Sequence, residues 1–174
     1  MIEPWEKIKE APERVGFRKL LRRVFVLPDG REEEFVVKDE RDCVCALVLT
    51  KDMNVILAKQ FRTGPEKVLL ELPGGICEEG EELERAMRRE LLEETGYAGY
   101  LTYLGPQYNC GYSTRVTHSF LVQDACKVSD PTPDKNEFIE IVEFSLEDLK
   151  RHLRSGQLTD AKTGFLALDY LDLL

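Results

Sequence analysis

Three glutamates, Glu90, Glu93 and Glu94, stand three and four residues apart in the acidic stretch Leu72–Gly96, shortly after two consecutive glycines. In a helix this spacing makes the carboxylates neighbours, and like charges there repel by about 0.2–0.5 kcal/mol per pair. Such a cluster suits either a face bathed in water or a bound cation. Hard divalent cations such as Mg²⁺ take carboxylate oxygens, commonly together with substrate phosphates. The stretch therefore has the residue types of a metal–phosphate site.

The elements around these glutamates decide which way the carboxylates point. A helix is predicted over residues 82–95, with Gly96 as its natural stop. At about 100° per residue, the three carboxylates continue the apolar stripe that begins at Leu83. A solvated helix would place its acids opposite that stripe. Arg89 stands four residues before Glu93 and can orient it. Periodicity alone leaves two interpretations open, an inward-facing metal site and a salt-bridged surface helix.

The rest of the chain predicts an α+β (mixed α/β) fold in a single domain, residues 1–174, with residues 1–40 as an N-terminal hairpin extension. The turn of the hairpin, 18–38, is predicted at Pro28-Asp29-Gly30. Ser145 is expected to cap a helix over 146–154, and Thr159 a last helix that runs to the C-terminus. The other expected strands are 43–50, 54–61, 67–75, 100–105, 117–124 and 138–145.

The composition narrows the class of partner and compartment. The net charge of −9 argues against a long nucleic acid as partner, because such binders need basic surface. No apolar run approaches the roughly 20 residues of a membrane span, and no signal peptide is apparent, so a cytoplasmic protein without a membrane partner is expected. The five cysteines include no C-x-x-C and are expected to be reduced. His118 and His152 stand too far apart to suggest a zinc site.

The acidic stretch resembles the box of the Nudix hydrolases, G-x5-E-x7-R-E-U-x-E-E-x-G-U, where U is apolar. The matching residues are Gly75, Glu81, Arg89, Glu90, Leu91, Glu93, Glu94, Gly96 and Tyr97. Only Tyr97 departs from the aliphatic preference of the last position. The flanking segments "KQFR", "ELPGG", "NEFIEIVEFSLEDL" and "LTDAKTGFLAL" resemble the ADP-ribose pyrophosphatase branch. Together they extend the resemblance to roughly residues 40–170.

This resemblance implies a Nudix fold, in which a mixed β-sheet lies between helices and the box forms a loop–helix–loop. It implies hydrolysis of the pyrophosphate bond in a nucleoside diphosphate linked to another group, with Mg²⁺ or Mn²⁺ as cofactor. ADP-ribose, cleaved to AMP and ribose 5-phosphate, is the leading substrate. Sugar nucleotides and nucleoside triphosphates remain alternatives, as does a non-catalytic nucleotide- or RNA-binding module. The intact glutamates favour catalysis.

The resemblance also assigns roles by position. Arg62 and Glu71 correspond to substrate contacts, and Glu81 to a supporting position. Arg115 stands where an acid is common after the box, so it is either a phosphate contact or a surface residue. The expected metal ligands are the Gly74 carbonyl, Glu90, Glu93 and Glu94.

A general base is expected from the late loop "DPTPDKNEFIE", because glutamates bound to a metal are poor proton acceptors. Glu137, at the end of the loop, is the first candidate, with Glu140 second and Asp134 third. Glu93 and Arg89 complete the expected catalytic set.

A homodimer is expected through the N-terminal strands, which carry Phe25 and Phe35 and resemble strands that help to build the nucleotide site of similar pyrophosphatases.

Overall fold

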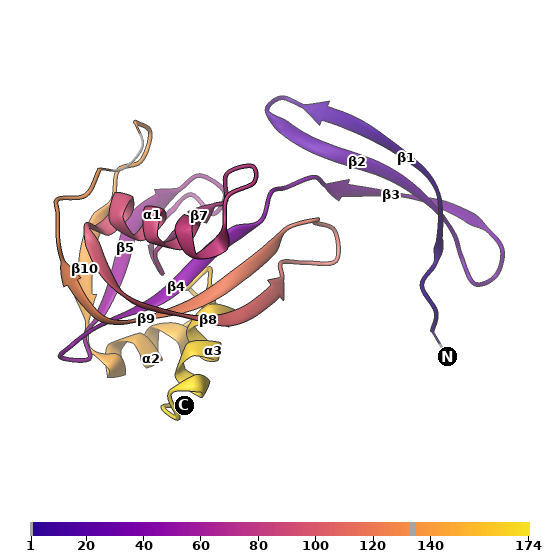
Figure 1. Ribbon diagram of the computed structural model, residues 1–174. Helices are drawn as coiled ribbons and strands as arrows, with labels where there is room; N and C mark the ends of the chain where they lie inside the picture. Colours follow the sequence, from indigo (N-terminus) through magenta and orange to yellow (C-terminus); the bar gives the residue numbers. More distant parts are fainter. Residues whose placement is uncertain (1, 133–134) are drawn as a thin grey trace. The chain divides into compact units, whose positions relative to one another are not determined.

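Figure 1 shows the computed structural model, which describes residues 2–132 and 135–174. The chain forms two compact units. The N-terminal unit comprises the residues up to Asp42 together with Tyr108–Val116, and the main unit comprises Cys43–Gln107 and Thr117–Leu174. Across the described residues, every helix falls short of the length and apolar character that a transmembrane span requires.

The N-terminal unit contains an antiparallel sheet of three strands in the order β1-β2-β3, where β1 is Glu6–Val15, β2 is Arg18–Val26 and β3 is Glu32–Lys38. The predicted hairpin is confirmed as β2 and β3. Its turn includes Gly30 at a φ of 84°, a conformation that glycine adopts without strain. Strand β1 was not predicted, because its polar sequence lacks a clear alternation and it forms by pairing along β2.

The main unit contains a mixed sheet in the order β10-β5-β4-β9-β8, with β6 paired to β5 and β7 paired to β4. Strands β4 and β9 run parallel, whereas β5, β6, β7 and β10 pair antiparallel with their neighbours. The strands are β4 Cys43–Thr50, β5 Val55–Arg62, β6 Lys67–Glu71, β7 Gly74–Ile76, β8 Tyr97–Tyr108, β9 Val116–Lys127 and β10 Glu140–Phe144.

Helices cover both faces of this sheet, as predicted (Figure 1). Strand β4 shows how the core divides, because successive side chains point to opposite faces. Val44, Ala46 and Val48 pack on the side of α1, whereas Cys45 and Leu47 pack on the side of α2 and α3. The helices are α1 Leu83–Thr95, α2 Leu146–Arg154 and α3 Ala161–Tyr170.

The helix ends test three sequence predictions. Helix α1 stops at Gly96, which has a φ of 72°, and the Ser145 side chain accepts a hydrogen bond from the Asp148 amide at the start of α2, as predicted. The prediction for Thr159 is wrong. Asp160 occupies the N-cap of α3, and the Thr159 hydroxyl instead donates to the buried Glu71 carboxylate.

Candidate active site

Periodicity left open whether the carboxylates of α1 face the core or the solvent, and the structure shows Glu90 and Glu94 turned inward and Glu93 partly exposed. Glu94 lies nearest the centre of the stripe and is only 5% exposed. The Glu90 side chain is 14% exposed, and Glu93, which lies farthest from the centre, is 43% exposed. Burial thus decreases in the order in which the helix rotates the three carboxylates away from the core.

Two glycines bring the backbone against these carboxylates. The Gly74 amide donates a hydrogen bond to Oε2 of Glu94 at 2.9 Å. A Cβ atom on Gly74 would collide with the backbone carbonyl of Val44, because β7 and β4 pair closely here. A Cβ atom on Gly75 would collide with the carboxylate of Glu90. The strand pairing therefore requires glycine at position 74, whereas a side chain at position 75 would displace the Glu90 carboxylate.

The carboxylates of Glu90 and Glu94 are removed from water without enough positive charge beside them to balance their own negative charge. Burial, reinforced by the charges of Glu90 and Glu137 and opposed by the hydrogen bond from Gly74, raises the pKa of Glu94 to about 8. Burial also raises the pKa of Glu90, although Arg89 opposes that change. Desolvation favours the neutral acid until a cation compensates the charge. Glu94 would therefore release its proton when a cation binds beside it.

Arg89 organises the outer part of the cluster. Its Nε and Nη2 atoms donate to the two oxygens of Glu81 at 3.0 and 2.9 Å, a bidentate pair that lowers the pKa of Glu81 to about 2. Its Nη1 atom donates to Glu90 at 2.8 Å and to Glu93 at 3.1 Å. Nη2 also donates to the carbonyl of Ile76, so the arginine ties the box loop to the helix.

The donor set fits a hard divalent cation. Carboxylate and carbonyl oxygens are the ligands that Mg²⁺ and Mn²⁺ accept, and the raised pKa values of Glu90 and Glu94 show uncompensated charge at this place. Within the described part of the chain, no three histidine, cysteine or acidic side chains are already arranged to enclose an ion. Gly74, Glu90, Glu93 and Glu94 therefore stay a predicted ligand set.

The two predicted substrate contacts, Arg62 and Glu71, lie on neighbouring strands and bind each other. Nε of Arg62, at the end of β5, donates to Oε2 of Glu71, at the end of β6, at 2.6 Å. Glu71 is 2% exposed, whereas the Arg62 side chain is 46% exposed. Thr159 donates to the other oxygen of Glu71 at 2.7 Å. Thr159 was predicted only as a helix cap, because its contact with Glu71 joins residues 88 positions apart in the chain.

The candidate bases differ in their surroundings. Glu137 is exposed, and its charge contributes to the raised pKa values of both Glu90 and Glu94. Glu140 begins β10 and forms an ion pair with Lys59 of β5 at 2.9 Å. Asp134, the third candidate, lies outside the described residues.

The loop that carries Glu137 starts beside α1. The Thr132 amide donates to the carbonyl of Glu93 at 2.8 Å, and the amides of Val128 and Ser129 both donate to the carbonyl of Gly96. A Cβ atom on Gly96 would collide with the carbonyl of Ser129. The end of the box helix therefore anchors the start of the late loop.

Arg115 belongs to the N-terminal unit. Its Nε atom donates to the carbonyl of Arg41 at 2.9 Å, and its Nη2 atom lies 3.9 Å from Oε1 of Glu40. The side chain thus supports the backbone of its own unit. A contact with substrate phosphate stays a prediction.

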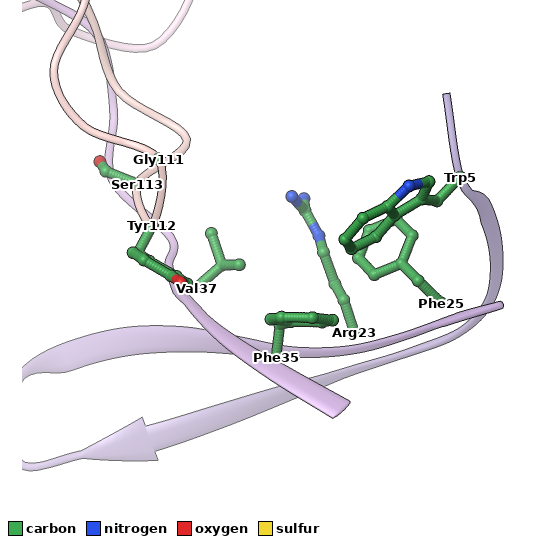
Figure 2. A pocket seen from close by; sticks show the side chains of 8 residues that line it. All are labelled: Trp5, Arg23, Phe25, Phe35, Val37, Gly111, Tyr112 and Ser113. Atoms are coloured by element: carbon green, nitrogen blue, oxygen red, sulfur yellow. The ribbon is translucent and has the colours of Figure 1, made fainter. Parts of the chain in front are cut away.

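The N-terminal unit contains a pocket of about 390 Å³ (Figure 2). Of its aromatic residues, only Phe25 and Phe35 were named from the sequence. Phe25, Phe35 and Trp5 form an aromatic cluster with ring centroids 6.0–6.5 Å apart. Arg23 and Tyr112 also line this pocket (Figure 2). The two phenylalanines were singled out only as residues on strands expected to mediate a homodimer, and Trp5 comes from a segment that no pattern singled out.

Comparisons with known proteins agree with this geometry. The NUDIX domain family matches residues 39–163. An ADP-ribose pyrophosphatase of Bacillus subtilis is 35% identical over 150 residues, which cover 84% of this chain and 80% of the relative. An ADP-sugar pyrophosphatase of Mus musculus is 40% identical over 106 residues, which cover 57% of this chain and 49% of the relative.

The fold also matches a solved structure. A crystal structure of an ADP compounds hydrolase superposes with a TM-score of 0.84 at 20% identity, covering 99% of this chain and 96% of the other. The expected mixed sheet between helices is thereby confirmed at the level of the whole fold. With the box complete from Gly75 to Tyr97 and the family match extending over most of the chain, this protein belongs to the Nudix hydrolase family.

Proposed function

We propose that this enzyme hydrolyses the pyrophosphate bond of ADP-ribose, giving AMP and ribose 5-phosphate. The observation that supports this most is the pair of buried carboxylates, Glu90 and Glu94, held against Gly74 and Gly75. Their burial disfavours ionisation until a cation arrives, which suits a site that takes up a metal together with an anionic substrate. The name of the Bacillus subtilis relative supports ADP-ribose as the substrate.

In this proposal the Gly74 carbonyl, Glu90, Glu93 and Glu94 hold Mg²⁺ or Mn²⁺. When bound, the metal neutralises phosphate oxygens and favours ionisation of the attacking water. Arg89 keeps Glu90 and Glu93 oriented through the hydrogen bonds described above.

Glu137 is the proposed general base, because its charge already acts on both Glu90 and Glu94. A base in that position can take a proton from water as the water attacks one phosphorus and the other phosphate leaves. Glu140 is the second candidate, and it forms an ion pair with Lys59.

Arg62 is the proposed substrate contact in the main unit, and the buried Glu71, which the resemblance also assigned to the substrate, holds Arg62 in place. Taken by itself, the aromatic pocket of the N-terminal unit is proposed to bind a nucleobase, since Trp5, Phe25 and Phe35 offer flat apolar surfaces on which a base can stack. We also propose that the N-terminal strands mediate a homodimer, because a three-stranded sheet has edges that can pair with a partner.

The pocket can be tested directly, because Trp5 is the single tryptophan of the chain. ADP-ribose and AMP should quench its fluorescence, whereas ribose 5-phosphate, which lacks the base, should not. Equal quenching by all three compounds would show that the nucleobase does not bind in this pocket.

The decisive experiment supplies purified enzyme with Mg²⁺ and a panel of nucleotides and identifies the products. AMP and ribose 5-phosphate from ADP-ribose support the proposal. Faster cleavage of another ADP-sugar would favour the sugar-nucleotide alternative, in line with the name of the mouse relative. A nucleoside monophosphate and pyrophosphate, released from a triphosphate, would assign the enzyme to a different substrate class.

A further inference from the structure

The hydroxyl of Thr159 lies between two acidic side chains just before α3. Its Oγ1 atom donates to Oε1 of Glu71 at 2.7 Å, and Oδ2 of Asp160 lies 3.0 Å away. Glu71 is almost fully buried, so its carboxylate depends on donors from the protein. Since Arg62 donates to Oε2, both oxygens of Glu71 are held, one from β5 and one from the segment before α3.

Glu71 in turn fixes the exposed arginine. A free arginine side chain samples many rotamers, and contact at Nε restricts the guanidinium plane of Arg62. The contact at Nε leaves the outer edge of the guanidinium, formed by Nη1 and Nη2, for another partner. None of the described residues supplies a hydrogen-bond acceptor to them. A guanidinium presented in this way can bind two oxygens of a phosphate side by side.

The core of the main unit fixes Thr159. Leu158, the preceding residue, is 4% exposed and belongs to the core, as does Leu168 of α3. The carbonyl of Asp160 accepts the Thr163 amide at 3.0 Å, which starts the helix directly after Thr159. The hydroxyl is thus held by a rigid element rather than by a free loop.

We propose that Thr159 is a positioning residue that, through Glu71, orients Arg62 to bind the diphosphate of a nucleoside diphosphate substrate. The inference rests on the proposed function, because it takes Arg62 as the group that meets the phosphates. Thr159 itself does not touch the substrate. Its hydroxyl acts by keeping the Glu71 carboxylate, and with it the Arg62 guanidinium, in one orientation.

The test is a series at one position. Thr159→Val keeps the size of the side chain but removes the donor, Thr159→Ser keeps the donor, and Thr159→Cys provides a weaker one. We expect Thr159→Val to raise KM for ADP-ribose about tenfold, which corresponds to about 1.4 kcal/mol, with kcat changed much less. Thr159→Ser should restore the wild-type KM, and Thr159→Cys should fall between. If Thr159→Val does not fold, the serine and cysteine variants still give the ranking.

Thr163→Val is the matched control. It removes a different buried hydrogen bond of α3, the 2.8 Å contact between Thr163 and Ser119, and leaves Glu71 untouched. It should lower Tm without changing KM. The proposal would be overturned if KM rose equally in both valine variants. It would also be overturned if KM did not follow the hydrogen-bond donor strength of the residue at position 159.

A binding measurement separates this inference from the proposed reaction. The affinity of each variant for ADP, followed by calorimetry, does not require turnover and should weaken in the same order as KM rises. If the wild type binds ADP but does not cleave ADP-ribose, the proposed substrate is wrong, and the ranking of ADP affinities still decides the role of Thr159.

Discussion

Glu94→Gln should stabilise the metal-free enzyme at alkaline pH although it removes a proposed metal ligand. Burial raises the pKa of Glu94 from 4.5 to about 8, which at 1.36 kcal/mol per pH unit corresponds to about 5 kcal/mol in favour of the neutral acid. A group whose pKa is higher in the folded state stabilises the fold below its unfolded pKa. That stabilisation is lost as the pH rises through the folded pKa. The wild type therefore loses stability between about pH 4.5 and pH 8.

Glutamine has no charge to desolvate, so the variant escapes this loss. The wild-type loss from Glu94 amounts to about 1 kcal/mol at pH 5 and about 4 kcal/mol at pH 8. The buried amide of glutamine costs about 1–3 kcal/mol if its N–H groups find no acceptor. The variant should therefore be no more stable than the wild type at pH 5 and more stable at pH 8, with the difference in Tm widening by about 10 °C.

The assay is thermal unfolding in EDTA across this pH range. Glu93→Gln is the control, because it removes a charge from the same helix at a position 43% exposed, where less desolvation is relieved, so its difference in Tm from the wild type should widen much less than that of Glu94→Gln. With Mg²⁺ added at pH 8, the wild type should gain stability and Glu94→Gln much less. A difference in Tm that stays constant between pH 5 and pH 8 would show that the carboxylate of Glu94 is not held in a desolvated place.

Three further predictions concern the same site and the assembly. Glu93→Gln should lower kcat at least tenfold with Tm unchanged or raised, because a metal ligand is lost while repulsion in the cluster falls; wild-type turnover would make Glu93 a surface residue. Glu137→Gln should lower kcat by about 10²–10⁴-fold with little change in Mg²⁺ affinity by calorimetry, and unchanged kcat would transfer the role of base to Glu140. Light scattering at micromolar concentration should detect a particle of twice the 20.0 kDa chain mass, and a particle of one chain mass would refute the homodimer.

The sequence alone determined the parts of this protein that depend on short-range pattern. The burial order of Glu94, Glu90 and Glu93 follows from the rotation of one helix, so the spacing of its residues was sufficient. Gly96 and Ser145 were identified because the ends of helices use local chemistry, a positive φ in one case and a side-chain oxygen in the other. The box itself identified the family, since its fixed positions lie within one loop and one helix.

Tertiary structure decided what depends on partners distant in the chain. Strand β1 forms by pairing with the edge of β2, and its own residues show no apolar–polar alternation from which a strand could be predicted. Thr159 has the right residue type for a helix cap, but the buried Glu71 carboxylate, 88 residues away, takes its hydroxyl instead. In the same way the pairing of β10 with β5 places Glu140 opposite Lys59 and ties it in an ion pair. A hydrogen bond or ion pair between distant residues exists only once the sheet has set their register, and that register is a property of the folded chain rather than of any segment of it.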